Sequence, residues 1–179
     1  MISLEVVAIL LSGISISASI FYYANILNNA NKARQTQLLM DLYQTYRSPE
    51  FFHDWDHVIW RIKADTWEEA MKSLHPLSST EGRKAWFSVG TFFNGVGVLV
   101  KRNLIDISLV DDLLGNMIKI AWEKIGPIEV ESRVRFNNPR AFEDFEYLYN
   151  EIVRVSEGRG SYKGLKNGFS FFEDIIKKP

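Results

Sequence analysis

The sequence predicts an all-α protein in which an N-terminal transmembrane helix is continuous with a small helical bundle. Residues 6–31 contain no charged side chain, and the segments after them repeat apolar residues at the spacing of helices. We find no run of alternating apolar and polar residues that would indicate a strand. The chain therefore divides into a transmembrane anchor in residues 1–31, a helical bundle domain in 32–157, and a Gly-rich linker with an apolar docking tail in 158–179.

The N-terminal segment is long enough to cross a membrane. Residues 6–27 are apolar, small or aromatic, apart from one asparagine. At about 1.5 Å per residue they form roughly 33 Å of helix, against about 30 Å for a hydrocarbon core. A cleaved signal peptide is the alternative. It requires a basic start and a shorter apolar core, whereas this start carries Glu5, so we favour an uncleaved span.

The charges indicate an orientation and exclude one class of partner. No Lys or Arg precedes the span, and the first ones after it are Lys32, Arg34 and Arg47. The positive-inside rule therefore predicts that the soluble part lies in the cytoplasm. With 21 basic and 22 acidic residues the net charge is −1, which argues against a nucleic-acid binder. We expect the span to hold the protein in the lipid bilayer.

The next helices follow from capping residues. The first helix is expected to continue to Ser48-Pro49, where Ser48 caps a second helix that ends near Ile62. Residues 66–69 read Thr-Trp-Glu-Glu, a capping box for a short third helix. Residues 75–79 are expected to form a loop.

Thr80 is expected to begin a long helix with one apolar face. Residues 85–100 carry no charge, so a second span is the alternative to a buried bundle helix, but 16 residues are short for a membrane. Its three glycines would let a neighbouring helix approach closely: Gly90, Gly95 and Gly97. The apolar stripe consists of Trp86, Val89, Phe93, Val96 and Val100.

Two further helices complete the predicted bundle. Asp106 is expected to cap the first of them, with a break expected at Gly115 and a kink at Pro127. Pro139 is expected to begin the last long helix. The predicted buried stripes of these two helices consist of Val110, Leu114, Met117, Ala121 and Ile125, and of Phe142, Phe145, Leu148, Ile152 and Val155.

Two segments are predicted to contact partners. In the span, small residues on one stripe let another helix approach closely. After a glycine-rich linker in residues 158–168, the tail is too apolar to remain free in water, so we expect it to dock on the bundle or on a partner. The predicted contact residues are Gly13, Ser17, Phe21, Phe169, Phe171, Phe172 and Ile176.

One pair of side chains has the spacing of metal ligands. On a helix His53 and His57 lie one turn apart on one face, so two imidazoles could share a metal. A third ligand is not evident, and Glu50 or His75 would have to be brought in by the fold. The alternative is a solvated polar face on an amphipathic helix. Its inward residues would then be Phe52, Trp55 and Ile59.

Other patterns indicate structure rather than chemistry. The chain has no cysteine, which excludes disulfides, thiolate metal sites and cysteine nucleophiles. The glycines of residues 90–97 lack the Lys and Ser or Thr of a phosphate-binding loop. Arg133 and Arg135, beside Glu129 and Glu131, are expected to form a salt-bridged helix surface. Trp67, in an acidic first turn, is the tryptophan we most expect to be exposed. No catalytic residue and no cofactor are predicted.

A set of turn and packing positions in the bundle accompanies the N-terminal anchor. They are Phe92 to Val100, Leu104 to Asp106, Leu109-Val110, Leu114-Gly115, Trp122-Glu123, Ile128, Arg133 and Phe142 to Glu146, together with Arg34 after the anchor. These features resemble an uncharacterised prokaryotic family of small proteins with one N-terminal span and a helical domain of unknown function. The resemblance covers roughly residues 4–155 and implies a fold and a membrane location, with no activity to carry over. That family commonly has an acidic residue near position 94, where this chain has Asn94.

These observations favour a noncatalytic, membrane-tethered helical protein that acts as a scaffold or accessory subunit of a membrane complex. Its expected partners are other membrane-protein subunits, or further copies of itself, bound through the span and the tail. The alternative is a membrane-anchored metal-binding protein or hydrolase that uses His53 and His57. A third possibility is a sensor whose bundle responds to a cytoplasmic ligand.

Overall fold

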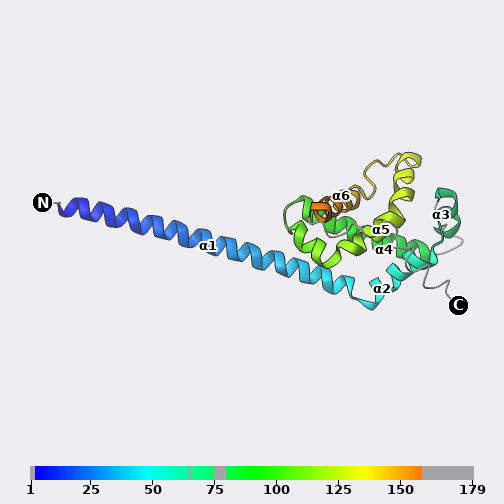
Figure 1. Cartoon of the computed structure of the whole chain (residues 1–179), viewed down its shortest axis with the longest axis horizontal. Coiled ribbons are helices and arrows are strands. Elements are labelled where there is room, and N and C mark those ends of the chain that lie inside the picture. Colours follow the sequence, from blue (N-terminus) through cyan, green and yellow to red (C-terminus); the bar gives the residue numbers. More distant parts are fainter. Residues whose placement is uncertain (1–2, 65, 75–79, 159–179) are drawn as a thin grey trace. The chain divides into compact units, whose positions relative to one another are not determined.

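The computed structural model describes residues 3–64, 66–74 and 80–158, and these form helices joined by turns (Figure 1). No strand occurs within these ranges, so the predicted all-α fold class is confirmed. The chain separates into two compact units, residues up to Leu38 and residues from Leu39 onward. The linker and tail beyond residue 158 lie outside the described residues.

Helix α1 (Leu4–Tyr46) is 43 residues long and runs without interruption past the predicted end of the anchor at residue 31. It is the one helix in the described part of the chain that is long and apolar enough to cross a membrane. The predicted continuity of the apolar segment with the following helix is therefore confirmed.

The second helix begins where its cap predicts but ends differently. Ser48 Oγ accepts a hydrogen bond of 3.1 Å from the backbone N–H of Phe51 and thereby caps α2 (Pro49–Asp56). From His57 to Arg61 the backbone widens into a π-helical turn, η1, closed by a 3.1 Å bond from the Ile62 N–H to the His57 carbonyl. No sequence pattern predicted this wider turn, a kind of turn that is common near functional residues.

The next two helices begin as predicted. Thr66 Oγ1 accepts from the Glu69 N–H at 3.3 Å at the start of α3 (Trp67–Leu74). Helix α4 (Thr80–Lys101) buries its predicted apolar stripe. The predicted loop of residues 75–79 lies outside the described residues.

Helix α5 (Ile107–Arg135) corrects one expectation. Asp106 Oδ1 caps it by accepting from the Ser108 N–H at 2.7 Å, as predicted. The expected break at Gly115 is wrong, because the helix continues through Gly115 and through Pro127. A Cβ at position 115 would collide with the Asp111 carboxylate, so the glycine makes room for a side chain rather than ending the helix.

Helix α6 (Glu143–Gly158) begins four residues later than Pro139, where we expected it. Asn137 and Phe142 have positive φ angles of 50° and 49°, so the chain turns twice before a regular helix can start. The first N–H groups of α6 are met from another helix. Asn94 Oδ1 on α4 accepts from the backbone N–H groups of Asp144 and Phe145, each at 3.2 Å.

The core of the bundle forms where α4, α5 and α6 meet (Figure 1). Phe145 stacks on Phe93 with ring centroids 5.2 Å apart and forms a T-shaped pair with Trp122, with centroids 4.9 Å apart. Phe51 of α2 also packs against Phe93, with ring centroids 6.2 Å apart. These aromatic residues, buried with the aliphatic stripes around them, hold the helices together.

The glycines of α4 do not act alike. A Cβ on Gly97 would overlap the carbonyl of Asp144, so this glycine lets α4 and α6 approach closely, as predicted. Gly95 has open space around it, and the expectation that it too permits close packing is wrong. Because α4 packs against α2, α3, α5 and α6, residues 85–100 form a bundle helix.

Candidate functional site

The histidine pair meets a carboxylate that the sequence did not single out. His53 Nε2 lies 3.4 Å and His57 Nδ1 lies 4.0 Å from the same Glu81 oxygen, which α4 supplies. The two imidazole rings are 6.5 Å apart. His57 Nδ1 is buried without a hydrogen bond. The contact joins α2 and η1 to α4 through imidazole and carboxylate groups.

No group of three or more His, Asp or Glu side chains within the described residues has an arrangement that would hold a metal ion. Glu50 is exposed, and His75 lies outside the described residues. The polar-face interpretation of this helix fits two of its three predicted inward residues. Trp55 and Ile59 are buried, but Phe52 is 59% exposed, so its predicted inward orientation is wrong.

Two faces of α1 carry small residues. Gly13, Ser17 and Phe21 lie on the predicted stripe, and all three are exposed. A shallow hollow lies instead over Ser15, Ser19 and Tyr23. Two positions at about 100° each separate the faces by about 200°, so they point in nearly opposite directions. The predicted contacts Phe169, Phe171, Phe172 and Ile176 lie outside the described residues.

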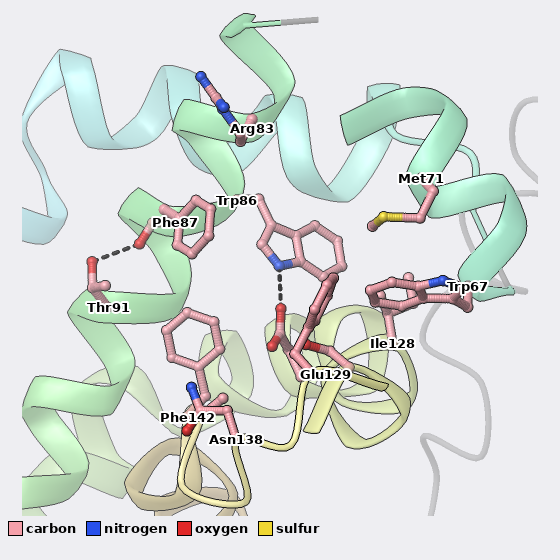
Figure 2. Close-up of a pocket in the computed structure, with 13 residues that line it drawn as sticks. Trp67, Met71, Arg83, Trp86, Phe87, Thr91, Ile128, Glu129, Asn138 and Phe142 are labelled. Atoms are coloured by element: carbon pink, nitrogen blue, oxygen red, sulfur yellow. Dashed lines mark hydrogen bonds between the residues drawn. The ribbon is translucent and has the colours of Figure 1, made fainter. Parts of the chain in front are cut away.

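The bundle contains an aromatic cavity of about 540 Å³. Helices α3, α4 and α5 and the connection from α5 to α6 all contribute to its lining. In Figure 2, Phe87 and Phe142 lie on one side of the Trp86–Glu129 pair, and Trp67 and Met71 lie on the other. A volume in this range is typical of small-molecule sites.

Glu129 is the acidic group of this cavity. Its residue is only 8% exposed, and its Oε1 accepts a hydrogen bond of 2.6 Å from the indole N–H of Trp86 (Figure 2). Burial raises the pKa of Glu129 above its ordinary value, and the Trp86 hydrogen bond and the Arg133 charge oppose that rise without cancelling it. The predicted salt-bridged surface is therefore wrong at this position.

The two arginines near the cavity are tied to the wall. Arg133 Nε donates to the Ala141 carbonyl at 2.7 Å, and its Nη1 pairs with Glu146. Arg135 pairs with Glu131 on its own helix and with Glu68 on α3. The predicted ion pairing of these arginines is therefore confirmed, although their partners come from several elements.

Trp67 corrects another expectation. It is 8% exposed, so it is buried rather than the exposed tryptophan we predicted. The Arg135 guanidinium carbon lies 5.4 Å from the centroid of its ring, and Phe136 contacts the ring edge to face at 5.6 Å. These contacts come from residues at the end of α5, at least 68 positions after Trp67. The residues next to Trp67 in the sequence therefore could not predict its burial.

The position of Glu129 in the sequence contains a signal for its burial. It lies four residues after Ile125 and one after Ile128, on the buried side of α5. An acid at such a position on an apolar stripe must find a polar partner or hold a proton. Its neighbours Glu131, Arg133 and Arg135 suggested a charged surface and hid this.

A second buried polar cluster lies between α5 and α6. Lys119 Nζ donates to Ser156 Oγ at 2.8 Å, and this hydroxyl lies 3.2 Å from Asp111 Oδ1 and 2.7 Å from the Ile152 carbonyl. A lysine beside a serine could activate a nucleophile, but Ser156 is 3% exposed and its hydroxyl is fully engaged. The cluster therefore joins the two helices.

Comparison with known proteins gives a family and no activity. No curated protein and no solved structure matches the chain. A family described as a domain of unknown function, DUF4760, matches residues 5–152, which cover α1 and the bundle as far as the middle of α6. Since this match covers most of the sequence and agrees with the predicted relationship, the chain belongs to the DUF4760 family.

Proposed function

We propose that this protein is a membrane-tethered, noncatalytic helical scaffold or accessory subunit of a membrane protein complex. The chain crosses the bilayer once, and the bundle lies on the cytoplasmic side. The basic residues that follow the span favour this orientation. Its partners are other membrane-protein subunits or further copies of the chain, bound through the span and the tail.

The exposed apolar surface of α1 carries this proposal. Large apolar side chains cover the helix from Leu4 to Leu27, and none of the residues in its most apolar stretch is buried. In water such a surface would drive association, whereas lipid or a partner helix accepts it.

The polar side chains of α1 also support insertion into lipid. The hydroxyls of Ser12, Ser15, Ser17 and Ser19 each bond the carbonyl four residues earlier, at 2.8 to 2.9 Å. Asn25 Nδ2 donates to the Phe21 carbonyl at 2.9 Å in the same manner. A helix that satisfies its own polar groups avoids most of the cost of burying them in hydrocarbon.

Native co-purification tests the proposal. The full chain is isolated from membranes in mild detergent, and the proteins that accompany it are identified and quantified by mass spectrometry. We expect at least one partner, or a second copy, at a fixed stoichiometry. Recovery of the chain alone as a monomer would overturn the proposal.

Matched variants locate the contact. Gly13→Leu with Ser17→Leu changes the predicted face of α1, and Ser15→Leu with Ser19→Leu changes the opposite face while adding similar bulk. We expect the first pair to release the partner and the second to retain it. Phe171→Ser with Phe172→Ser tests the tail separately. If neither the first span pair nor the tail pair changes recovery, the predicted contact residues are wrong.

The metal-binding alternative keeps one supporting observation, the carboxylate of Glu81 beside both histidines. Elemental analysis of protein purified without an affinity tag tests it. The alternative predicts a stoichiometric metal that is lost when His53 and His57 are both changed to Ala. Less than about a tenth of an equivalent in the unchanged protein would end it.

A further inference from the structure

The aromatic cavity has the composition of a ligand site rather than of a packing defect. Phe87 and Phe136, on its rim, are 55% and 65% exposed, although aromatic rings next to a cavity gain by being covered. Phe142 rests on Gly90, where a Cβ would crowd its ring, and its ring centroid lies 6.4 Å from that of Phe87. The fold thus places aromatic rings around the opening of the cavity.

The acid in this cavity has no ion-pair partner of its own among the residues that the structure describes. Glu129 receives one hydrogen bond, from the neutral indole of Trp86, although it is almost fully buried. A buried carboxylate is costly unless a cation or several donors compensate it. The Arg133 charge acts on Glu129 and lowers its pKa, but no ion pair or hydrogen bond joins a cation to this carboxylate among the described residues.

The nearby arginines do not supply that charge directly. Arg133 is held by Glu146 and by the Ala141 carbonyl. Arg135 is held by Glu131 and Glu68 over the face of Trp67. Arg83 also lines the cavity, but Figure 2 shows its guanidinium directed away from Trp86 and Glu129.

We propose that this cavity binds a small organic cation, in which a protonated or quaternary amine is attached to an apolar body. The ammonium group would pair with the Glu129 carboxylate, and the apolar body would contact Phe87, Phe142 or the other aromatic rings that line the cavity. Aromatic rings attract cations through their electron-rich faces, and a carboxylate excluded from water adds a charge-assisted hydrogen bond. The cavity lies entirely within residues 67–142, so this inference is independent of the proposed membrane partner.

A charge series of one molecular shape tests the proposal. The full chain is placed in phosphatidylglycerol nanodiscs, which contain no ammonium group, and titrated with 2-phenylethylamine and with 2-phenylethanol. Calorimetry measures binding, and empty nanodiscs supply the background. We expect the amine to bind at least about tenfold more tightly than the alcohol, because only the amine pairs with the carboxylate. Equal affinities, or no saturable binding by about 10 mM, would overturn the proposal.

Two variants assign the preference to Glu129. Glu129→Gln can still accept the Trp86 N–H and should reduce the preference for the amine to about twofold or less. Glu123→Gln removes an exposed acid of the same helix and should leave the preference unchanged. If Glu129→Gln fails to fold, Phe87→Leu replaces it. This variant should weaken both probes at least about threefold, since it removes a ring from the rim. A preference that survives Glu129→Gln, or affinities unchanged by Phe87→Leu, would contradict the assignment.

The amine could come from a lipid headgroup or from a free metabolite, and the nanodisc composition separates these sources. In phosphatidylcholine nanodiscs, an apparent amine affinity lowered by more than about threefold supports the proposal with the headgroup as occupant. An unchanged affinity supports it with a free amine as occupant.

Discussion

Helix α1 and the bundle satisfy their polar side chains in opposite ways. On α1, each of the four serines in the span bonds a carbonyl four residues earlier in the same helix. In the bundle, Trp86 reaches Glu129 across 43 positions, and Asn94 reaches the backbone of α6 across 50 and 51. Ser156 combines both, since it bonds its own helix and Lys119 of α5.

This difference separates what each region needs in order to fold. The span serines bond only carbonyls of α1, so this part of the helix satisfies their hydroxyls without a neighbouring helix. The bundle helices instead form hydrogen bonds with one another, so an isolated α4, α5 or α6 would lose polar partners that its neighbours supply. All five tryptophans lie in the bundle, so tryptophan fluorescence measures its unfolding without a contribution from α1.

The largest expected effect comes from the closest approach of two bundle helices. Gly97→Ala places a methyl group on the Asp144 carbonyl, which belongs to the backbone and cannot move without shifting α6. We expect a loss of about 3 kcal/mol in the free energy of unfolding, measured by denaturant titration of the full chain in detergent.

Gly95→Ala, on the same helix, is the matched control, because a Cβ at this position has no neighbour within 4 Å. It should stabilise the bundle by about 0.5 to 1 kcal/mol through helix propensity alone. Equal effects of the two variants would mean that α4 and α6 do not approach as closely as described.

The second effect should come from the cluster between α5 and α6. Ser156→Ala removes a hydroxyl that accepts from Lys119 and lies beside Asp111, leaving two charged groups without it. The same denaturant titration should show a loss of about 1 to 3 kcal/mol. A loss below about 0.5 kcal/mol would show that water replaces the hydroxyl at little cost.

Asn94 provides the third test. Asn94→Ala leaves two N–H groups at the start of α6 without their acceptor and should cost about 1 to 2 kcal/mol in unfolding free energy. Asn94→Asp keeps an oxygen there and adds a charge that suits a helix N-terminus, so it should recover most of that loss. The family that the sequence resembles commonly has an acidic residue near position 94, and its carboxylate would accept the same hydrogen bonds from α6. If the Asp variant is as unstable as the Ala variant, this account of the cap is wrong.

A fourth prediction concerns pH. The pKa of Glu129 is raised above its ordinary value of 4.5, mainly by burial, so the folded state holds this proton more tightly than the unfolded chain. Its contribution to stability is fully present below the unfolded pKa and is lost as pH rises through the folded pKa. Relative to Glu129→Gln, the unchanged protein should therefore lose stability across that interval, measured by thermal unfolding at a series of pH values. A difference that grows with pH would contradict this sign.

The smallest effect should come from α1. Ser17→Ala removes a hydroxyl bonded only to its own helix, so the unfolding of the bundle should change by less than about 0.5 kcal/mol. Tryptophan fluorescence during denaturant titration measures it. A large change would show that the span and the bundle unfold together.

The local rules explain which parts of the fold could be predicted. Caps such as Ser48, Thr66 and Asp106 lie next to the helices they begin, so their patterns are visible in a few residues. The predicted start of α6 was wrong, because the N–H groups of its first turn donate to Asn94, which lies on another helix 50 positions earlier. Pro139 gave a valid local signal for a helix start, and the positive φ of Phe142 overrode it.

The candidate site was less predictable for the same reason. His53 and His57 were visible because they share one helix, whereas Glu81 joins them only through the packing of α4. The cavity draws its residues from three helices and a connection, and no short pattern contains them. The charged residues near Glu129 in the sequence suggested a charged surface, whereas the apolar stripe on which Glu129 lies indicated burial.

Phe142 gives laboratory evolution a way to separate two selective pressures. Its left-handed backbone suits glycine or asparagine better than an aromatic residue, yet its ring forms a wall of the cavity. Selection for thermal stability alone would weigh the relief of this backbone, about 1 to 2 kcal/mol, against the ring's contacts with Gly90 and Phe87. Selection for binding would keep the aromatic residue. The residue recovered at this one position would report which property was under selection.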